Sequence, residues 1–261
     1  MTVKSAATQT AAADIAKFAR PDALIISLQN GIGNDVVLRS AAARNSVLAG
    51  MVRFNVVHRG DGRFHQGSEG GLDVARHAAL VPFLGAFERA GLPLTEHDDI
   101  AAVQWAKLLL NLNNAVNALS GLPLKAQLAQ RGYRRCTALA QEEGLRVLAA
   151  ANIRPAKLTL LPPDWIPRVL RLPDAWFRRI AARMLAIDPL ARSSMQDDLA
   201  ANRKTEVDWL NGEIVRLAQR VRRAAPVNRK LVELIRAAEA GEQRRWSGEA
   251  LLAQLEETLL I

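Results

Sequence analysis

The sequence lacks the features that mark several common classes of protein. Its 261 residues include a single cysteine, Cys136, which excludes an internal disulfide and a cysteine-cluster metal site. No uncharged apolar run reaches the roughly 18 residues that a membrane-spanning helix needs. The opening residues MTVKSAATQT also lack the apolar stretch of a signal peptide. We therefore expect a soluble, cytoplasmic protein in which Cys136 is a free, buried thiol.

Aromatic residues are scarce, at 5% of the chain with tyrosine occurring once. Proteins that bind single strands or RNA stack bases on aromatic side chains, and no such platform is visible. The net charge of +9 and the pI of about 10.5 are compatible with nucleic acid, an anionic membrane surface or small anionic ligands. Because the basic residues are scattered through helical stretches such as 168–184 and 216–230, we interpret them as a solvated face. We expect no nucleic-acid or membrane partner.

Several catalytic and binding motifs are missing. No GxGxxG follows an expected strand, so the usual pyrophosphate cradle of a dinucleotide-binding fold is absent. The sequence also has no P-loop, HExxH or GxSxG motif. The four histidines, at positions 58, 65, 77 and 97, have no metal-ligand spacing, and we predict no metal site.

The first part of the chain has the rhythm of an α/β layer. An apolar run leads into the polar loop QNGIGN over 23–34, a helix is expected near 34–43, and a second strand over 47–57. Strand, helix, strand is typical of a parallel sheet, and a loop at the carboxyl end of such a strand is where open α/β sheets bind ligands. Glycines in 59–75 favour a hairpin at the sheet edge, and 78–90 should form a covering helix.

From about Asp98 the pattern becomes helical, with 49% hydrophobic residues in the whole chain to fill a core. We predict helices near 99–119, 125–151, 174–188, 192–222, 228–239 and 247–259. The proline-rich segment 154–169 is expected to be a connector. The predicted fold class is thus α/β plus all-α, with domains at 1–98 and 99–261.

The helical stretch 104–119, QWAKLLLNLNNAVNAL, carries unusually many polar residues for an apolar helix. At about 100° per residue, Asn111 and Asn114 lie within roughly 40° of Lys107, so these three share one stripe. Asn113 and Asn117 fall elsewhere and are expected to be structural. Burying such groups without partners is costly, so the stripe either lines a cleft or forms a solvent-exposed helix edge.

A second polar cluster spans 192–217. Ser193 or Ser194 can cap a helix, with Gln196 or Asp197 at the capping-box distance, which is a sufficient structural explanation. Glu206 is interpreted either as a surface carboxylate or as one that lines a cleft.

Five segments, in order and spacing, resemble the ketopantoate reductase family, the 2-dehydropantoate 2-reductases. They are VKS at 3–5, SLQNGIGN at 27–34, WAKLLLNLNNAVNAL at 105–119, SSMQDDL at 193–199, and TEVDWLNGEIV followed by APVN within 205–228. The resemblance covers essentially the whole chain. It implies a Rossmann-like N-terminal domain that binds NADPH and a helical C-terminal domain that closes over the substrate. The implied reaction reduces 2-dehydropantoate to pantoate, on the route to pantothenate and coenzyme A.

The resemblance also implies roles for particular residues. Lys107 would be the general acid that protonates the ketone oxygen, and an ammonium suits this because it also offsets the developing negative charge. Asn111 and Ser194 would bind the polar groups of a 2-keto acid substrate, with Asn30 nearby. The residues on the NADPH side would be Lys4, Asn30, Val56 and Glu206.

Two departures from the family pattern affect substrate binding. Where many members have a second substrate asparagine, this chain has Ala115, and Leu124 stands in place of another. We therefore expect either that Asn114 takes over part of the lost contact or that the substrate is a different 2-keto acid.

A third departure concerns the N-terminus. The VKS segment normally follows a first βαβαβ stretch, so we expect this chain to represent only part of the Rossmann-like domain. On that basis we predict weak NADPH binding and little turnover by the chain alone. The alternative is a catalytically silent remnant that serves as an interaction domain, and a homodimer is also considered.

Overall fold

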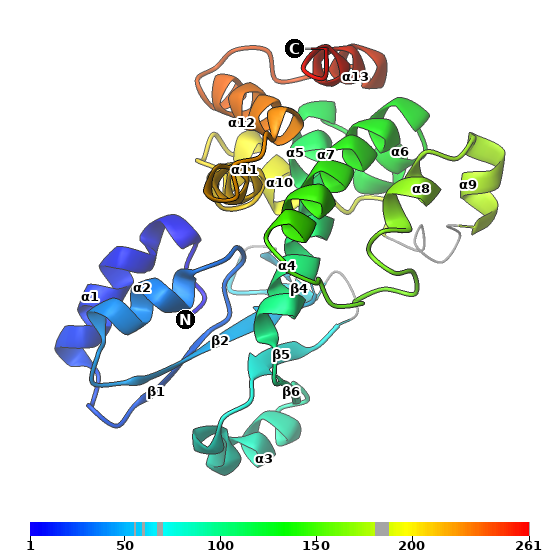
Figure 1. The fold of residues 1–261 in the computed structure, drawn as a ribbon. Helices are drawn as coiled ribbons and strands as arrows, with labels where there is room; N and C mark the ends of the chain where they lie inside the picture. The colour runs from blue at the N-terminus through cyan, green and yellow to red at the C-terminus, as the bar shows by residue number, and fades with distance from the viewer. Residues whose placement is uncertain (55, 59–60, 67–69, 181–187, 261) are drawn as a thin grey trace. The chain divides into compact units, whose positions relative to one another are not determined.

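The computed structural model describes residues 1–54, 56–58, 61–66, 70–180 and 188–260. The chain divides into two compact units, Met1–Lys107 and Leu108–Ile261 (Figure 1).

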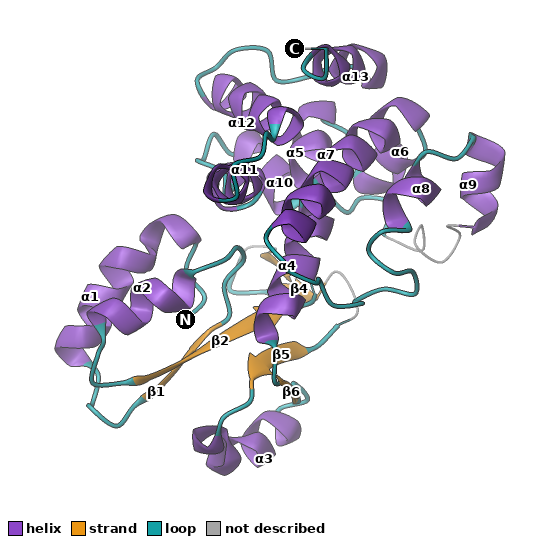
Figure 2. Cartoon of the chain, viewed as in Figure 1, coloured by secondary structure: helices purple, strands orange, loops and turns teal. Residues whose placement is uncertain are grey.

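The first unit is built on a four-stranded sheet in the order β1-β2-β5-β6 (Figure 2). Its strands are β1 (Leu24–Ser27), β2 (Ser46–Val52), β5 (Leu72–Ala75) and β6 (Leu94–His97). The β1–β2 pair is parallel, as predicted for an α/β layer, and the β5–β6 pair is also parallel, whereas β2 and β5 are antiparallel. The sheet is therefore mixed.

Helices cover this sheet with separate apolar clusters. They are η1 (Ser5–Ala7), α1 (Thr8–Phe18), α2 (Asn34–Ala41), η2 (Ala78–Leu80) and α3 (Val81–Arg89). Ala12 of α1 and Leu38 of α2 pack with Ile25 and Val47 of the strands. Leu80 packs with residues of β2 and β5. The helices near 34–43 and 78–90 are confirmed, while α1 and β6 were not predicted.

The prediction of one strand over 47–57 is wrong. β2 ends at Val52, and β3 (Val56–His58) pairs instead with β4 (Phe64–Gln66) in a two-stranded sheet. The chain leaves the ladder at Arg53, whose side chain forms an ion pair with the buried Asp73 of β5. A charged side chain in that position interrupts the apolar pattern that a continuous strand would need.

Helices are the only regular secondary structure among the described residues of the second unit. It contains α5 (Asn113–Ser120), α6 (Leu124–Leu128), α7 (Arg131–Ala150), α8 (Ile166–Leu170), α9 (Asp174–Ile180), α10 (Ser194–Ala200), η3 (Val207–Trp209), α11 (Asn211–Arg220), α12 (Pro226–Glu239) and α13 (Gly248–Glu257). The long helix α7 packs against α5, α8, α12 and α13 and forms the centre of this unit. The remaining helix, α4 (Ile100–Asn111), contributes residues to both units.

Several predicted helices are interrupted. The helix expected over 99–119 is two helices, α4 and α5, separated at Leu112, which keeps helical dihedral angles. The stretch 125–151 divides into α6 and α7 because Gln130 is extended. The stretch 192–222 divides into α10, η3 and α11, since Asn202 has a left-handed φ of 52° that ends α10. Residues 181–187 of the helix expected at 174–188 lie outside the described residues.

Candidate active site

A buried polar network fixes the loop that follows β1. Gln29 donates to the carbonyl of Val3 (3.0 Å) and to the hydroxyl of Thr8 (2.7 Å). Asn34 accepts from Thr8 (2.9 Å) and donates to Ser5 Oγ (3.2 Å). These hydrogen bonds join the loop to η1 and α1, so the residues of QNGIGN have a defined backbone position.

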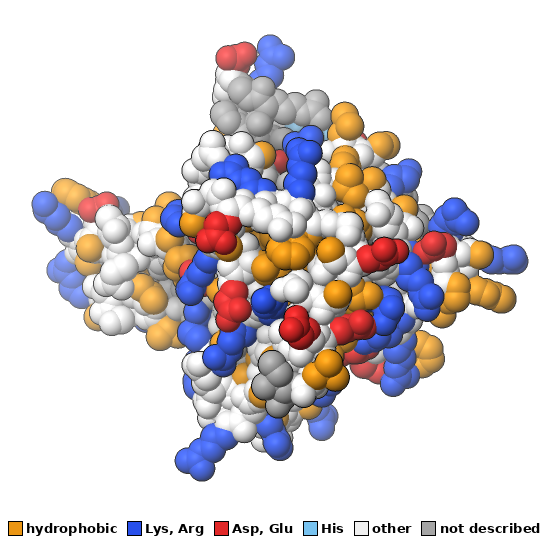
Figure 3. All heavy atoms as spheres, turned by 90° about the horizontal axis from the view of Figure 1, so that it is seen from above, with side chains coloured by type: hydrophobic (Ala, Val, Ile, Leu, Met, Phe, Trp, Pro, Cys, Tyr) orange, Lys and Arg blue, Asp and Glu red, His pale blue; other side chains and the backbone are white. Residues whose placement is uncertain are grey.

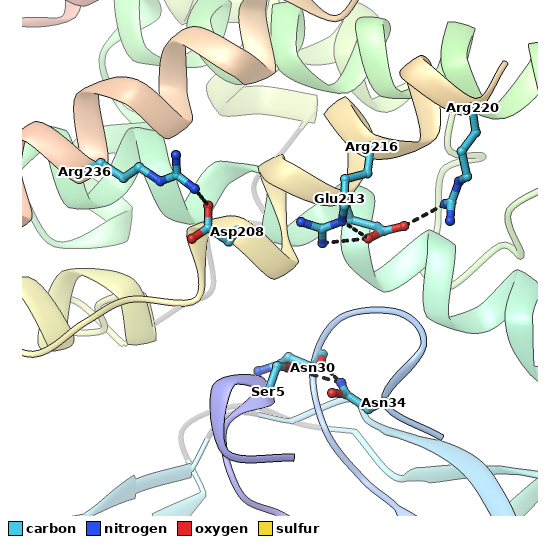
Figure 4. A network of polar contacts seen from close by, with 8 residues as sticks. All are labelled: Ser5, Asn30, Asn34, Asp208, Glu213, Arg216, Arg220 and Arg236. Carbon is cyan, nitrogen blue, oxygen red and sulfur yellow. Dashed lines mark hydrogen bonds and ion pairs between the residues drawn. The ribbon is translucent and has the colours of Figure 1, made fainter. Parts of the chain in front are cut away.

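The predicted residues Asn30 and Lys4 lie at this loop. The carbonyl of Asn30 accepts hydrogen bonds from Ser5 Oγ (3.0 Å) and Asn34 Nδ2 (2.8 Å), which Figure 4 shows at close range. Gly33, with φ of 84°, is the N-cap of α2, and a Cβ at this position would meet nothing within 4 Å. Lys4 is exposed and precedes η1. The first unit thus offers a fixed polar loop with open space at Gly33.

Lys107 is half-buried on α4, between Ala106 and Leu108, which are both buried. Its Nζ donates a hydrogen bond to the backbone carbonyl of Arg53 (3.4 Å). Desolvation lowers the pKa of this ammonium below its ordinary value of 10.5. A lysine with a lowered pKa gives up a proton more readily than an exposed one.

The four asparagines of the polar stretch differ in their contacts. Asn113 bonds to Gln127 in both directions (3.1 and 3.3 Å) and accepts from Thr137 (2.6 Å). Asn117 is fully buried, donates to the carbonyl of Leu122 and accepts from the backbone N–H of Ser193. Both are structural, as expected, because their amides are satisfied within the helical unit.

Asn111 and Asn114 are half-buried, Asn111 at the end of α4 and Asn114 on α5. The backbone carbonyl of Asn114 accepts from Ser193 Oγ (3.4 Å). Among the described contacts, neither side-chain amide has a hydrogen-bond partner within the protein. Their amides are therefore available to a ligand.

The two serines at the start of α10 differ in burial and in their hydrogen bonds. Ser193 is the N-cap, and its buried Oγ accepts from the N–H of Gln196 (3.2 Å), so the capping prediction is confirmed for Ser193. Ser194 is exposed in the first turn. Glu206 is half-buried and precedes η3, where its carbonyl accepts from Trp209 and Leu210. Val56 is 53% exposed on β3.

The sequence did not indicate Arg53, which contacts Lys107, or the residues connected to it, Asp73 and His97. Asp73 is 1% exposed in β5, and its carboxylate contacts Arg53 Nε (2.7 Å) and His97 Nε2 (2.6 Å). The signal that could have identified them is the aspartate inside the apolar strand LDVA, because a buried carboxylate needs partners.

A surface hollow in the second unit has none of the predicted site residues in its lining. It has a volume of about 310 Å³, and residues of α11 and α12 line it. Arg236 is paired with Asp208 (2.6 Å), and Glu213 holds Arg216 and Arg220 (2.7 and 2.8 Å; Figure 4). Because these arginines are neutralised within the unit, we assign the hollow no ligand.

The described residues contain neither a cluster of metal ligands nor a membrane-spanning helix. In that part of the chain no three histidine, cysteine or carboxylate side chains are grouped as metal ligands. No helix within it is long and apolar enough to span a bilayer.

Comparison with known proteins covers both units. The family model "Ketopantoate reductase PanE/ApbA" matches residues 1–79, and "Ketopantoate reductase PanE/ApbA C terminal" matches 99–239. The chain belongs to the ketopantoate reductase family. Its curated relatives in this family include the 2-dehydropantoate 2-reductase of Halobacterium salinarum, 30% identical over 226 residues that cover 83% of this chain and 68% of the relative. The enzyme of that name from Archaeoglobus fulgidus is 28% identical, covering 92% and 76%.

Solved structures agree with the family assignment. A ketopantoate reductase family protein from Ralstonia eutropha superimposes with a TM-score of 0.77 at 30% identity, over 93% of this chain and 75% of that one. D-mandelate dehydrogenase in ternary complex with NADH and anilino(oxo)acetate shares the fold, with a TM-score of 0.76 at 20% identity, over 92% and 75%. The fold is that of the family, a Rossmann-like unit and a helical unit. As a ketopantoate reductase family member the chain is an oxidoreductase.

In the first unit of this family member, the loop after β1 is a candidate ligand site. The polar loop lies at the carboxyl end of β1, where open α/β sheets bind ligands, and its backbone is fixed around open space at Gly33. The sequence has no counterpart of the Gly-rich pyrophosphate loop.

Proposed function

We propose that this chain catalyses the NADPH-dependent reduction of 2-dehydropantoate to pantoate, or of a related 2-keto acid. The observation that carries the proposal is the half-buried Lys107, with its lowered pKa, on the helix where the family motif WAKLLLNLNNAVNAL lies. The relatives named 2-dehydropantoate 2-reductase support the substrate class.

In this mechanism Lys107 supplies the proton. A bound nicotinamide supplies the hydride that reaches the carbonyl carbon. The Nζ of Lys107 donates one of its three hydrogens to the carbonyl of Arg53, which leaves the others for the ketone oxygen. Its positive charge stabilises the developing alkoxide, and proton transfer to that oxygen completes the alcohol.

The remaining predicted residues are assigned to binding. We propose that Asn111, Asn114, Ser194 and Asn30 hold the carboxylate and hydroxyl groups of the substrate. Lys4, Asn30, Val56 and Glu206 would lie on the NADPH side.

The experiment compares Lys107→Ala with the intact chain in an NADPH oxidation assay on a panel of 2-keto acids. We expect kcat/KM to fall by about 10²- to 10⁴-fold because the general acid is lost. Lys125→Ala, which removes an exposed lysine of α6, is the matched control and should not change kcat/KM. Wild-type rates from Lys107→Ala would contradict the mechanism.

Two further measurements test the substrate-binding role of Asn114 and the identity of the cofactor. Asn114→Ala should change the order of preference among 2-keto acids, and an unchanged order would count against a role for Asn114. Titration with NADPH and with NADH, followed by nicotinamide fluorescence, tests the cofactor. A chain that binds neither and has no turnover would favour the alternative of an interaction domain.

A further inference from the structure

Asp73 is a buried carboxylate in the first unit that the proposed reaction does not use directly. Its side chain is 1% exposed in the strand β5. Oδ2 lies 2.7 Å from Arg53 Nε, and Oδ1 lies 2.6 Å from His97 Nε2. Oδ1 has a hydrogen-bond partner in His97, whereas the contact with Arg53 is an ion pair by distance whose geometry gives neither Arg53 Nε nor Asp73 Oδ2 a hydrogen bond. Burying a carboxylate is costly, and these two contacts offset part of that cost.

Arg53 connects this carboxylate to Lys107. Its side chain pairs with Asp73, and its backbone N–H donates to the carbonyl of Gly71 (3.0 Å). A Cβ at Gly70 would come within 2.9 Å of the Arg53 backbone, so the chain packs closely there. The carbonyl of Arg53 accepts the hydrogen bond from Lys107 Nζ. Arg53 is thus fixed by its side chain and by its backbone at the point where Lys107 binds.

We infer that Asp73 is a positioning residue for Lys107, which it acts on by holding Arg53 so that the Arg53 carbonyl orients the lysine ammonium. The inference rests on the role proposed for Lys107 in catalysis. Asp73 itself has no contact with Lys107 among the described residues.

The length of the Lys107 contact makes it sensitive to the position of Arg53. At 3.4 Å the hydrogen bond is near the outer limit, so a small displacement of the Arg53 carbonyl would break it. An ammonium on a flexible four-carbon side chain would then rotate among several orientations. Misplacing a catalytic group by about 1 Å can reduce the rate by as much as roughly a hundredfold.

A purely structural role for Asp73 makes a different prediction. In that case Asp73 only joins β2, β5 and β6 through Arg53 and His97. Its replacement would then lower stability without changing the chemistry of Lys107. A readout on Lys107 itself therefore separates the two roles.

The experiment uses Asp73→Asn in the full chain, which removes the negative charge of the side chain and keeps its shape. We expect kcat to fall by about tenfold with the KM for the 2-keto acid changed less than about twofold, because ground-state binding is retained. Asp98→Asn is the matched control: it removes the exposed Arg76–Asp98 ion pair of the same unit and should leave both constants unchanged.

A second measurement follows the protonation of Lys107 by chemical labelling and needs no activity assay. Acetic anhydride labels uncharged amines, and mass spectrometry of digested protein gives the labelling of Lys107 relative to the exposed Lys125. If Asp73→Asn displaces the Arg53 carbonyl, Lys107 loses the hydrogen bond that favours its charged form, which lowers the pKa of Lys107. We expect labelling of Lys107 at neutral pH to rise about threefold, which corresponds to half a pKa unit.

Arg53→Met provides a second variant if Asp73→Asn fails to fold. It keeps the backbone carbonyl but loses the ion pair, and it should also reduce kcat with KM retained. The inference is overturned if either folded variant keeps wild-type kcat and wild-type labelling of Lys107. If Lys107→Ala has full activity, the proposed function fails instead, and the labelling experiment still decides whether Asp73 acts on Lys107.

Discussion

The thiol of Cys136 lies inside the helical unit, where its Sγ is 3.9 Å from the carbonyl of Gly248 at the start of α13. It is fully buried, as the sequence predicted for a lone cysteine. Burial raises its pKa from 9.0 to about 12. The folded chain therefore favours the neutral thiol, which is neither a nucleophile nor a metal ligand in this form.

We predict that Cys136 does not react with Ellman's reagent at about pH 8 in the folded chain and reacts fully in urea. Because the folded pKa is raised, the stability contributed by the neutral thiol is complete below pH 9.0 and is lost as the pH rises towards 12. Urea midpoints should thus fall less steeply above pH 9 for Cys136→Ala than for the wild type. Rapid labelling without urea would contradict the burial.

Residues differ in how far the sequence could predict them. Asn113 and Asn117 were expected to be structural from their helical angle alone, and their hydrogen bonds agree. Arg53 and Asp73 could not be paired from sequence, because the antiparallel register that aligns β2 with β5 is a tertiary property.

At the scale of elements, the N-terminus of helix α12 is capped by a side chain of the neighbouring helix α7. Its N-cap, Ala225, has no capping side chain. Instead the buried carboxylate of Glu143 on α7 accepts from the N–H groups of Val227 (3.0 Å) and Asn228 (2.8 Å). It also accepts from Asn228 Nδ2 (2.9 Å). One side chain thus satisfies the first turn of α12 and joins it to α7.

We predict that Glu143→Ala lowers the free energy of unfolding by about 2–4 kcal/mol, because it leaves buried N–H groups without acceptors. The matched control is Glu142→Ala at the adjacent position, which removes a partly exposed ion pair with Arg171 and should cost less than about 1 kcal/mol. Urea denaturation followed by circular dichroism measures both. Equal losses would show that the cap is not needed.

Most helices of the second unit could be located from apolar periodicity, but their ends could not. The interruption at Asn202 depends on one left-handed residue, and asparagine only permits that conformation without requiring it. The helix α1 was missed because its sequence, TQTAAADIAKF, is rich in alanine and buries only Thr8 and Ala12. The strand β6 has four half-buried or exposed residues, so it lacks an apolar signal.

At the scale of the whole molecule, the net charge of +9 is the difference between many basic and many acidic residues. Acidic side chains lie among basic ones on the face shown in Figure 3. Many arginines form ion pairs with carboxylates of their own unit, including Arg171 with Glu142 and Arg236 with Asp208. Such pairs reduce the field that would attract a polyanion.

We predict that any binding to duplex DNA is weak and disappears by about 0.2 M salt, because it would depend on counterion release alone. Fluorescence anisotropy with a labelled duplex at increasing salt measures this. Affinity tighter than about 1 μM that persists at that salt concentration would contradict the interpretation of the charge as a solvated face.

Helix α4 determines which length changes the chain can tolerate. Lys107 and Asn111 are one turn apart in this continuous helix, so their separation of about 6 Å along the axis follows from backbone geometry. A residue inserted between them would rotate Asn111 by about 100° away from Lys107. Insertions and deletions should therefore not be tolerated between positions 107 and 111.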